Sequence, residues 1–222
     1  MDAAFWQACW QQNKLGFQLA QPHPLLQRWL PQILAEQPRL TEIVVPLCGK
    51  SPDLLFCQAL RPVLGIELSD IACHAFFAEN QLAHTVTTAH PLAEQGFIRF
   101  QAEALQLLQG DFFQLPDSRV NANNLIYDRA ALIALPLEMR QRYVEKLDNW
   151  LEQGAALLLI SLEYPEDEKT GPPFSVTSAE IEQHFAKRHI QLLEQVDITG
   201  QGFARRRFET SRLCEKVYLV QA

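Results

Sequence analysis

Residues 42–70 read EIVVPLCGKSPDLLFCQALRPVLGIELSD, and this stretch decides the fold class. The apolar runs Glu42–Leu47 and Pro62–Leu68 predict two buried strands. Between them, a turn at Cys48-Gly49 leads into a helix over about 51–60. A strand, a helix and a second strand in this order indicate parallel pairing, because a parallel connection needs a crossover of a dozen or more residues.

The same alternation of strands and helices extends in both directions from this stretch. Two helices precede it, and Ser69 is a suitable cap for the helix that follows it. The other predicted elements are helices at Phe5–Gln12, Leu25–Leu34, Asp70–Asn80, Pro136–Glu152 (ended by Gly154) and Ser178–Lys187 (capped by Ser178), and strands near Val86 and at Asn124–Asp128, Ala155–Glu163, Ile190–Asp197 and Leu213–Gln221, with a hairpin allowed over Phe97–Gln101 and Ala104–Gln109.

This pattern predicts an α/β fold with a Rossmann-like, mainly parallel sheet and helices on both faces. The last two strands have no helix between them, so the final strand is expected to be antiparallel. With neither an internal repeat nor a linker, we expect a single domain over residues 1–222. Residues 1–40 are long enough to form a helical lid over the carboxyl edge of the sheet.

Composition excludes several classes of protein. Hydrophobic residues make up 48% and charged residues 20% of the 222, which is the balance of a compact soluble protein. The net charge of −7 argues against a nucleic-acid partner, and the one dense basic cluster, Arg205–Arg207, is either a solvated loop or a contact for a small anion. No apolar run is long enough to cross a membrane, and the first residues lack the pattern of a secretory signal, so we expect a cytoplasmic location.

The cysteines and histidines do not suggest a metal site. The five cysteines form no C-x-x-C pair, and their odd number does not fit a disulfide framework. His184 and His189 have no nearby cysteine or aspartate to complete a set of ligands. We therefore expect no metal.

Three places in the sequence fit a ligand site at the carboxyl ends of the strands, where ligands of such sheets bind. Gly49 lies in the turn after the first strand, where the lack of a side chain allows close approach of the backbone to a ligand. Glu67 ends the second strand, where a carboxylate can accept both ribose hydroxyls of a nucleoside. Asp111 and Phe112, which follow Gly110, offer a carboxylate and a ring where an adenine would lie.

Each of these features also has a purely structural explanation. Glu67 can be a solvated strand end, Gly49 an ordinary turn, and Phe112 part of the core. Together, in this order and spacing, they favour binding of a nucleoside. A phosphate-binding loop is excluded, because Val44 stands where that loop needs its first glycine, and the G-x-G-x-x-G of a nicotinamide dehydrogenase is absent after the first strand.

With these residues assembled, the sequence resembles the thiopurine S-methyltransferase family, in a bacterial-type form. The resemblance spans nearly the whole chain, and the combination of motifs is specific. The matching runs, in order, are Val45–Ser51, Leu64–Ser69, Phe76–Asn80, Gly110–Phe113, Tyr127–Leu132, Gly171–Phe174 and Cys214–Leu219. The implied fold is the class I methyltransferase sheet, and the implied protein is a cytosolic, monomeric enzyme that uses S-adenosylmethionine to methylate the sulfur of aromatic and heterocyclic thiols such as thiopurines.

The resemblance also implies the residues of the site. Those matching cofactor-binding positions are Trp10, Leu47, Glu67, Asp111, Phe112 and Arg129. Phe17 matches an acceptor-pocket position in the N-terminal lid, and the next residue is Gln18 where the family usually has histidine. This departure leaves the acceptor end of the pocket less defined than the cofactor end.

Such a transfer needs few catalytic residues, because a sulfonium methyl group is already activated and the protein mainly has to position the reactants. We expect no obligatory general base. Arg129 would be the catalytic residue, stabilising a thiolate or heterocyclic anion, unless it is a structural partner of Asp128 or another carboxylate. Trp10 and Phe17 would be flat walls of the acceptor pocket, unless they only pack a helix.

The natural acceptor is left open. The resemblance to bacterial-type members of the family implies an inorganic selenium or tellurium compound as one alternative acceptor. Another small acceptor, such as a halide or a carboxylate, is a second alternative, and a non-catalytic nucleoside-binding protein is a third. An amine is disfavoured, because Gly171 offers no acceptor side chain in a motif that otherwise resembles that of amine methyltransferases.

Overall fold

The structure is a computed structural model that describes residues 3–201 and 208–222. The chain divides into two compact units, Met1–Arg119 and Val120–Ala222, and each is described by itself. The prediction of one domain over residues 1–222 stays a prediction. The basic cluster Arg205–Arg207 lies outside the described residues.

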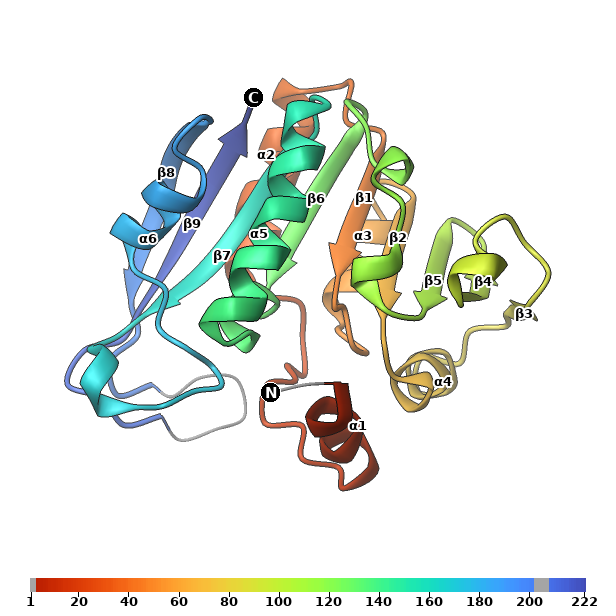
Figure 1. The fold of residues 1–222 in the computed structure, drawn as a ribbon, viewed down its shortest axis with the longest axis horizontal. Helices are drawn as coiled ribbons and strands as arrows, with labels where there is room; N and C mark the ends of the chain where they lie inside the picture. The colour runs from red at the N-terminus through yellow and green to blue at the C-terminus, as the bar shows by residue number, and fades with distance from the viewer. Residues whose placement is uncertain (1–2, 202–207) are drawn as a thin grey trace. The chain divides into compact units, whose positions relative to one another are not determined.

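The N-terminal unit contains five strands in the order β3-β4-β5-β2-β1, together with helices that precede and connect them (Figure 1). Its elements are α1 (Ala3–Gln11), α2 (Pro24–Glu36), β1 (Glu42–Pro46), α3 (Asp53–Gln58), β2 (Val63–Glu67), α4 (Asp70–Glu79), β3 (Thr85–Thr87), η1 (Ala93–Gln95), β4 (Ile98–Ala102), β5 (Leu105–Gln109), η2 (Phe112–Gln114) and η3 (Asp117–Arg119).

Three strands of this unit are parallel: β1 pairs with β2, and β2 pairs with β5. All five residues of β2 are buried, which explains why this strand is a continuous apolar run. Gly65 is needed in its middle, because a Cβ there would lie 2.4 Å from Leu107 Cδ2 of β5. The parallel register brings the carboxyl ends of β1, β2 and β5 to one edge.

The hairpin that the sequence allowed is present, since β4 and β5 pair antiparallel, with Ile98 opposite Gln109 and Ala102 opposite Leu105. Glu103 takes a left-handed φ of 49° in the turn between them. The apolar pattern just N-terminal to Gly110 is ambiguous because two short strands follow each other there without a helix between them.

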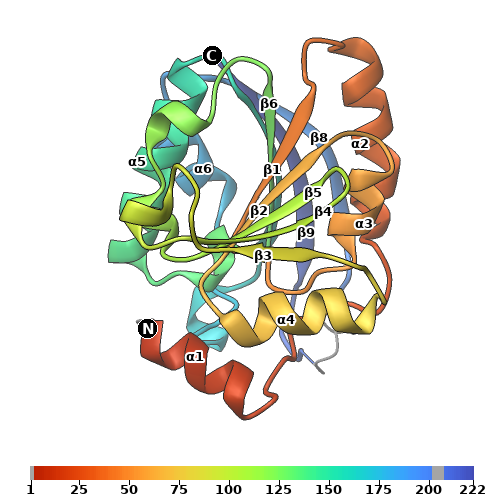
Figure 2. The same cartoon turned by 90° about the vertical axis from the view of Figure 1, so that its right-hand side faces the viewer.

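The helices of this unit begin and end close to the predicted positions. Ser69 caps α4, its hydroxyl accepting a hydrogen bond from the Ala72 N–H. Helices α2 and α3 lie on the same face of the sheet (Figure 2). Five apolar residues of α2 are buried, so this helix belongs to the packing of the sheet. They are Leu25, Leu26, Leu30, Ile33 and Leu34.

The C-terminal unit contains four strands in the order β6-β7-β9-β8. Helices α5 and α6 lie over the same face of these strands (Figure 1). The elements are β6 (Asn124–Arg129), η4 (Leu132–Ala134), α5 (Leu137–Glu152), β7 (Ala156–Glu163), η5 (Glu166–Glu168), α6 (Ser178–His184), β8 (His189–Asp197) and β9 (Cys214–Gln221).

The pairing in this unit agrees with the expected antiparallel ending. β6 and β7 are parallel, whereas β9 is antiparallel to both β7 and β8. Seven of the eight residues of β7 are buried, as its apolar sequence predicts. Gly154 takes a left-handed φ of 91° after α5 and ends that helix.

One predicted cap is wrong by one residue. Thr177 is the N-cap of α6, with its hydroxyl accepting a hydrogen bond from the Glu180 N–H, and Ser178 is the first helical residue. Both residue types cap helices well, so the sequence alone could not separate them. Ser178 instead forms hydrogen bonds through its hydroxyl with Tyr218 and Lys216.

Candidate functional site

Glu67 is the centre of the predicted site in the N-terminal unit. It ends β2, is only 7% exposed, and accepts a backbone N–H on each carboxylate oxygen: Gly49 on Oε2 at 2.8 Å and Ser69 on Oε1 at 2.7 Å. Burial raises the pKa of Glu67, while these backbone N–H groups act in the opposite direction. A carboxylate has about four acceptor positions, so both oxygens can still accept hydroxyl groups of a ligand.

The turn after β1, residues 47–51, is held in an unusual conformation and is called the Gly49 turn below. Leu47 has a φ of 48° and Gly49 a φ of 54°. A left-handed leucine is uncommon and persists only where the surroundings enforce it, which is frequent at ligand sites. A Cβ at Gly49 would lie 3.2 Å from Trp10 Cζ2, so the glycine allows the indole ring to pack directly on the backbone.

The segment after β5 joins the same edge of the sheet. The Gly110 N–H donates to the Glu67 carbonyl at 2.8 Å, which links the ends of β5 and β2. Asp111 is exposed, and its carboxylate accepts the Phe113 N–H at 2.9 Å. Phe112 is buried, at 4% exposure, so its ring contributes to packing beneath this edge. Three motifs that are distant in the sequence are therefore connected through Glu67.

Helix α1 brings aromatic side chains to this edge. The Phe17 ring makes edge-to-face contacts with Trp10 and Trp6, both with ring centroids 5.8 Å apart. Trp10 is buried and Phe17 is half-buried. The Gln7 side chain reaches the Leu68 carbonyl at 3.5 Å. The N-terminal unit thus brings together Trp10, Leu47, Glu67, Asp111, Phe112 and Phe17 around the carboxyl ends of β1, β2 and β5.

Gln18 is part of this arrangement, although the sequence marked it only as a departure from the family pattern. It is 7% exposed, and its Nε2 donates to the Lys50 carbonyl in the Gly49 turn at 2.7 Å. The two residues are separated by 32 positions, so no local pattern connects them. The sequence offered two weak signals here: a polar residue directly after an aromatic one, and a departure from the histidine that the family usually has.

Arg129 belongs to the C-terminal unit, where it is the last residue of β6 and is half-buried. The turn after it is shaped by Asp128, whose Oδ1 accepts the N–H groups of Ala131 and Leu132, both at 3.2 Å. Ala130, between Arg129 and Ala131, has a left-handed φ of 68°. The Tyr143 hydroxyl of α5 donates to Asp128 Oδ2 at 2.7 Å. Asp128 therefore holds the backbone that presents Arg129.

This buried carboxylate predicts a pH-dependent stability. Burial raises the pKa of Asp128 from 3.8 to about 6, although Tyr143 and the two N–H groups lower it. The folded protein consequently binds a proton more tightly than the unfolded chain. The contribution of Asp128 to stability is fully present below pH 3.8 and is lost as the pH rises through about 6.

We expect the Asp128→Asn variant to gain stability relative to the wild type as the pH rises from 4 to 7, by up to about 3 kcal/mol. The amide oxygen can still accept both backbone N–H groups, and no charge is buried. Urea unfolding at several pH values measures this difference. The exposed Asp167→Asn serves as control and should leave the pH dependence unchanged. A difference that is constant over this range would contradict the assignment.

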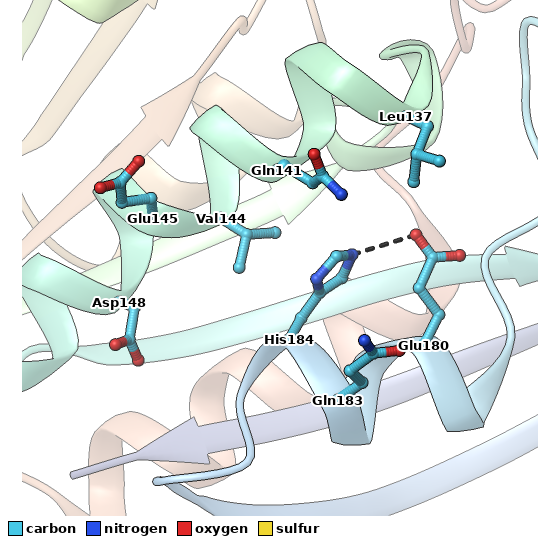
Figure 3. Close-up of a pocket in the computed structure, with 8 residues that line it drawn as sticks. All are labelled: Leu137, Gln141, Val144, Glu145, Asp148, Glu180, Gln183 and His184. Atoms are coloured by element: carbon cyan, nitrogen blue, oxygen red, sulfur yellow. Dashed lines mark hydrogen bonds and ion pairs between the residues drawn. The ribbon is translucent and has the colours of Figure 1, made fainter.

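A pocket of ≈ 470 Å³ in the C-terminal unit lies between α5 and α6 (Figure 3). None of the predicted site residues lines it. Its walls are helix side chains, and two of them, Glu180 and His184, form a hydrogen bond at 3.0 Å. The carboxylate of a third lining residue, Asp148, accepts hydrogen bonds from the Arg188 guanidinium. The lining residues are Leu137, Gln141, Val144, Glu145, Asp148, Glu180, Gln183 and His184. This pocket is not the predicted ligand site.

Within the described residues, no helix is long and apolar enough to cross a membrane.

Comparison with known families gives one match over the entire chain: the family model described as thiopurine S-methyltransferase covers residues 1–222. Curated relatives carry the same name. A thiopurine S-methyltransferase of Pseudomonas paraeruginosa is 42% identical over 225 residues, covering 100% of this chain and 99% of the relative. One of Vibrio vulnificus is 42% identical over 222 residues, covering 99% and 98%.

Solved structures show the same fold. A SAM-dependent methyltransferase from Anabaena variabilis superposes with a TM-score of 0.62 at 15% identity, covering 99% of this chain and 94% of that one. The N-terminal domain of EvdMO1, solved in the presence of SAH and D-fucose, gives a TM-score of 0.56 at 13% identity, covering 100% and 97%. The predicted Rossmann-like methyltransferase fold is therefore confirmed.

Proposed function

We propose that this chain, which belongs to the thiopurine S-methyltransferase family, transfers the methyl group of S-adenosylmethionine to the sulfur of aromatic or heterocyclic thiols. The observation that carries this proposal is the convergence on Glu67. Its carboxylate holds the Gly49 N–H, and its backbone carbonyl holds the Gly110 N–H, so the segments after β1, β2 and β5 form one connected edge.

The described residues fit the cofactor. Glu67 has acceptor positions left for the two ribose hydroxyls. Gly49 has no side chain of its own that would keep a ligand from its backbone, and the left-handed Leu47 fixes the path of the turn. Asp111 is exposed beside Phe112, where it can accept a hydrogen bond from an adenine. Trp10 closes over the turn.

When bound, S-adenosylmethionine supplies a methyl group that is activated by the positive sulfur to which it is attached. The protein has to hold the acceptor sulfur in line with this methyl group and exclude water. A free thiol has a pKa near ~8.5, so a small fraction is thiolate at neutral pH. Arg129 would stabilise that thiolate, since a guanidinium stays charged, and Trp10 and Phe17 would flank a flat acceptor.

The proposal also covers the oligomeric state, the location and the partners of the protein. The enzyme is monomeric and cytoplasmic, acts on small acceptors and has no nucleic-acid partner; the net charge of −7 supports the last of these points. The small size of the acceptor is supported by the family's description, since a thiopurine is a small molecule.

The decisive experiment is transfer of label from methyl-labelled S-adenosylmethionine to 6-mercaptopurine by the purified protein. We expect label in the extracted thioether. If the protein binds S-adenosylhomocysteine but transfers no label, the thiol acceptor is wrong, and selenite, tellurite, halides and carboxylates become the acceptors to test in the same assay. Binding without transfer to any of them would indicate a non-catalytic nucleoside-binding protein.

A further inference from the structure

A buried side chain in the segment between α1 and α2 forms a hydrogen bond with the Gly49 turn. This connecting segment, residues 12–23, is mostly exposed or half-exposed, yet Gln18 within it is 7% exposed. Its Nε2 donates to the Lys50 carbonyl at 2.7 Å. Because a carbonyl can only accept, the orientation of the amide is fixed by this contact.

A hydrogen bond to the Lys50 carbonyl can affect the conformation of the Gly49 turn, because Lys50 is part of that turn. Lys50 follows Gly49 directly, and the Gly49 N–H is already bound to Glu67 Oε2. The Lys50 ammonium forms an ion pair with Glu79 at 2.5 Å, so the side chain of this residue is held on α4. Two backbone groups of the Gly49 turn are therefore bound by side chains: Glu67 accepts the Gly49 N–H, and Gln18 donates to the Lys50 carbonyl.

The same segment carries the aromatic contacts of the site. Phe17, next to Gln18, contacts the rings of Trp6 and Trp10, and Trp10 packs on Gly49. Asn13, two residues after the end of α1, has a left-handed φ of 53°. At the other end, the His23 N–H donates to Asp53, and the Asp53 N–H donates to the Ser51 hydroxyl at the end of the Gly49 turn. Between these ends, Gln18 donates directly to the backbone of the turn.

We propose that Gln18 is a positioning residue, a latch that keeps the segment 12–23 closed on the Gly49 turn and so pre-organises the cofactor site before ligand binds. The hydrogen bond from the buried Gln18 amide to the Lys50 carbonyl favours the closed segment over opened states by the net strength of such a bond. Pre-organisation reduces the ordering that a ligand must otherwise impose, which increases its affinity. The proposal rests on the proposed function only where it assigns the Gly49 turn to the cofactor.

The first test measures the latch without any ligand. In the Gln18→Met variant the side chain has similar size and no donor. Trypsin cleavage after the exposed Lys14, detected by mass spectrometry of the N-terminal fragment, should be about fivefold to tenfold faster than in the wild type, the factor that one hydrogen bond of ordinary net strength supplies. The Gln32→Met variant is the matched control, since Gln32 also donates from Nε2 to a backbone carbonyl, that of Arg28, but is exposed on α2.

The second test separates positioning from a general loss of structure. In Gln18→Met, the dissociation constant of S-adenosylhomocysteine and the KM for S-adenosylmethionine should rise in proportion to the loss of closed population, at most by the factor measured for cleavage, while kcat and the unfolding midpoint change little, because the closed state remains the reacting state. Equal cleavage rates in the variant and the wild type would overturn the latch, whether or not the protein methylates thiols. Faster cleavage with unchanged affinity would overturn its role in the cofactor site.

Discussion

Replacing Glu67 by alanine is expected to weaken the binding of S-adenosylhomocysteine by at least about 100-fold. The wild-type carboxylate is buried and oriented by the N–H groups of Gly49 and Ser69, and it would accept both ribose hydroxyls. Each hydrogen bond to a charged group contributes about 1.5–3 kcal/mol, so the loss of two removes several kcal/mol of binding free energy. Titration calorimetry measures this directly.

The same substitution leaves two backbone N–H groups without their acceptor, so a loss of stability must be distinguished from a loss of binding. Glu42→Ala is the control. Glu42 is also a carboxylate of the N-terminal unit that accepts two hydrogen bonds, both from the Arg119 guanidinium at 2.8 Å, but it lies at the start of β1, away from the carboxyl ends of the strands. Both variants should unfold at lower urea concentration, and only Glu67→Ala should lose cofactor affinity. Unchanged affinity in Glu67→Ala would overturn the role of this residue.

The pH dependence of binding gives an independent check. Burial raises the pKa of Glu67, and only the ionised carboxylate can accept from both hydroxyls. Wild-type affinity should therefore decline on acidification at a higher pH than an ordinary glutamate would produce. The Glu67→Ala variant should lack this decline.

The strands and helices followed from the sequence because their signals are local. Parallel strands that are buried on both faces must be apolar throughout, and β2 and β7 were found for this reason. The single-residue error at Thr177 arose where two adjacent residues cap equally well. The hairpin β4–β5 was only allowed by the sequence, because two adjacent short apolar segments do not reveal whether they pair.

The candidate site was predictable as far as it depends on sheet topology. Since parallel strands present their carboxyl ends at one edge, the sequence alone predicts that Gly49, Glu67 and Gly110 lie together. The side-chain partners could not. Tyr143 binds Asp128 and Gln18 binds Lys50 across tertiary contacts, and neither pair shows any spacing that periodicity would detect. Such contacts depend on how elements pack, which one sequence does not specify.

Replacing Arg129 by methionine is expected to reduce kcat/KM for 6-mercaptopurine by about 10- to 100-fold at neutral pH, since the loss of one charge-stabilising group at a reacting atom typically has this size or more. Asp128 and the left-handed Ala130 fix the turn that follows Arg129, so methionine should keep the backbone in place. Steady-state kinetics with the labelled methyl donor measures the effect.

The pH profile decides whether Arg129 acts on the acceptor or only on the structure. A guanidinium beside the sulfur lowers the pKa of the bound thiol, so the wild-type rate should reach its plateau at a lower pH than the rate of Arg129→Met. The loss should shrink for acceptors whose thiols are more acidic, because they are already ionised. Arg188→Met is the control: Arg188 pairs with Asp148 at 2.6 Å beside α5, and its removal should leave the pH profile in place. An equal loss for Arg129→Met at every pH and with every acceptor would assign Arg129 a structural role.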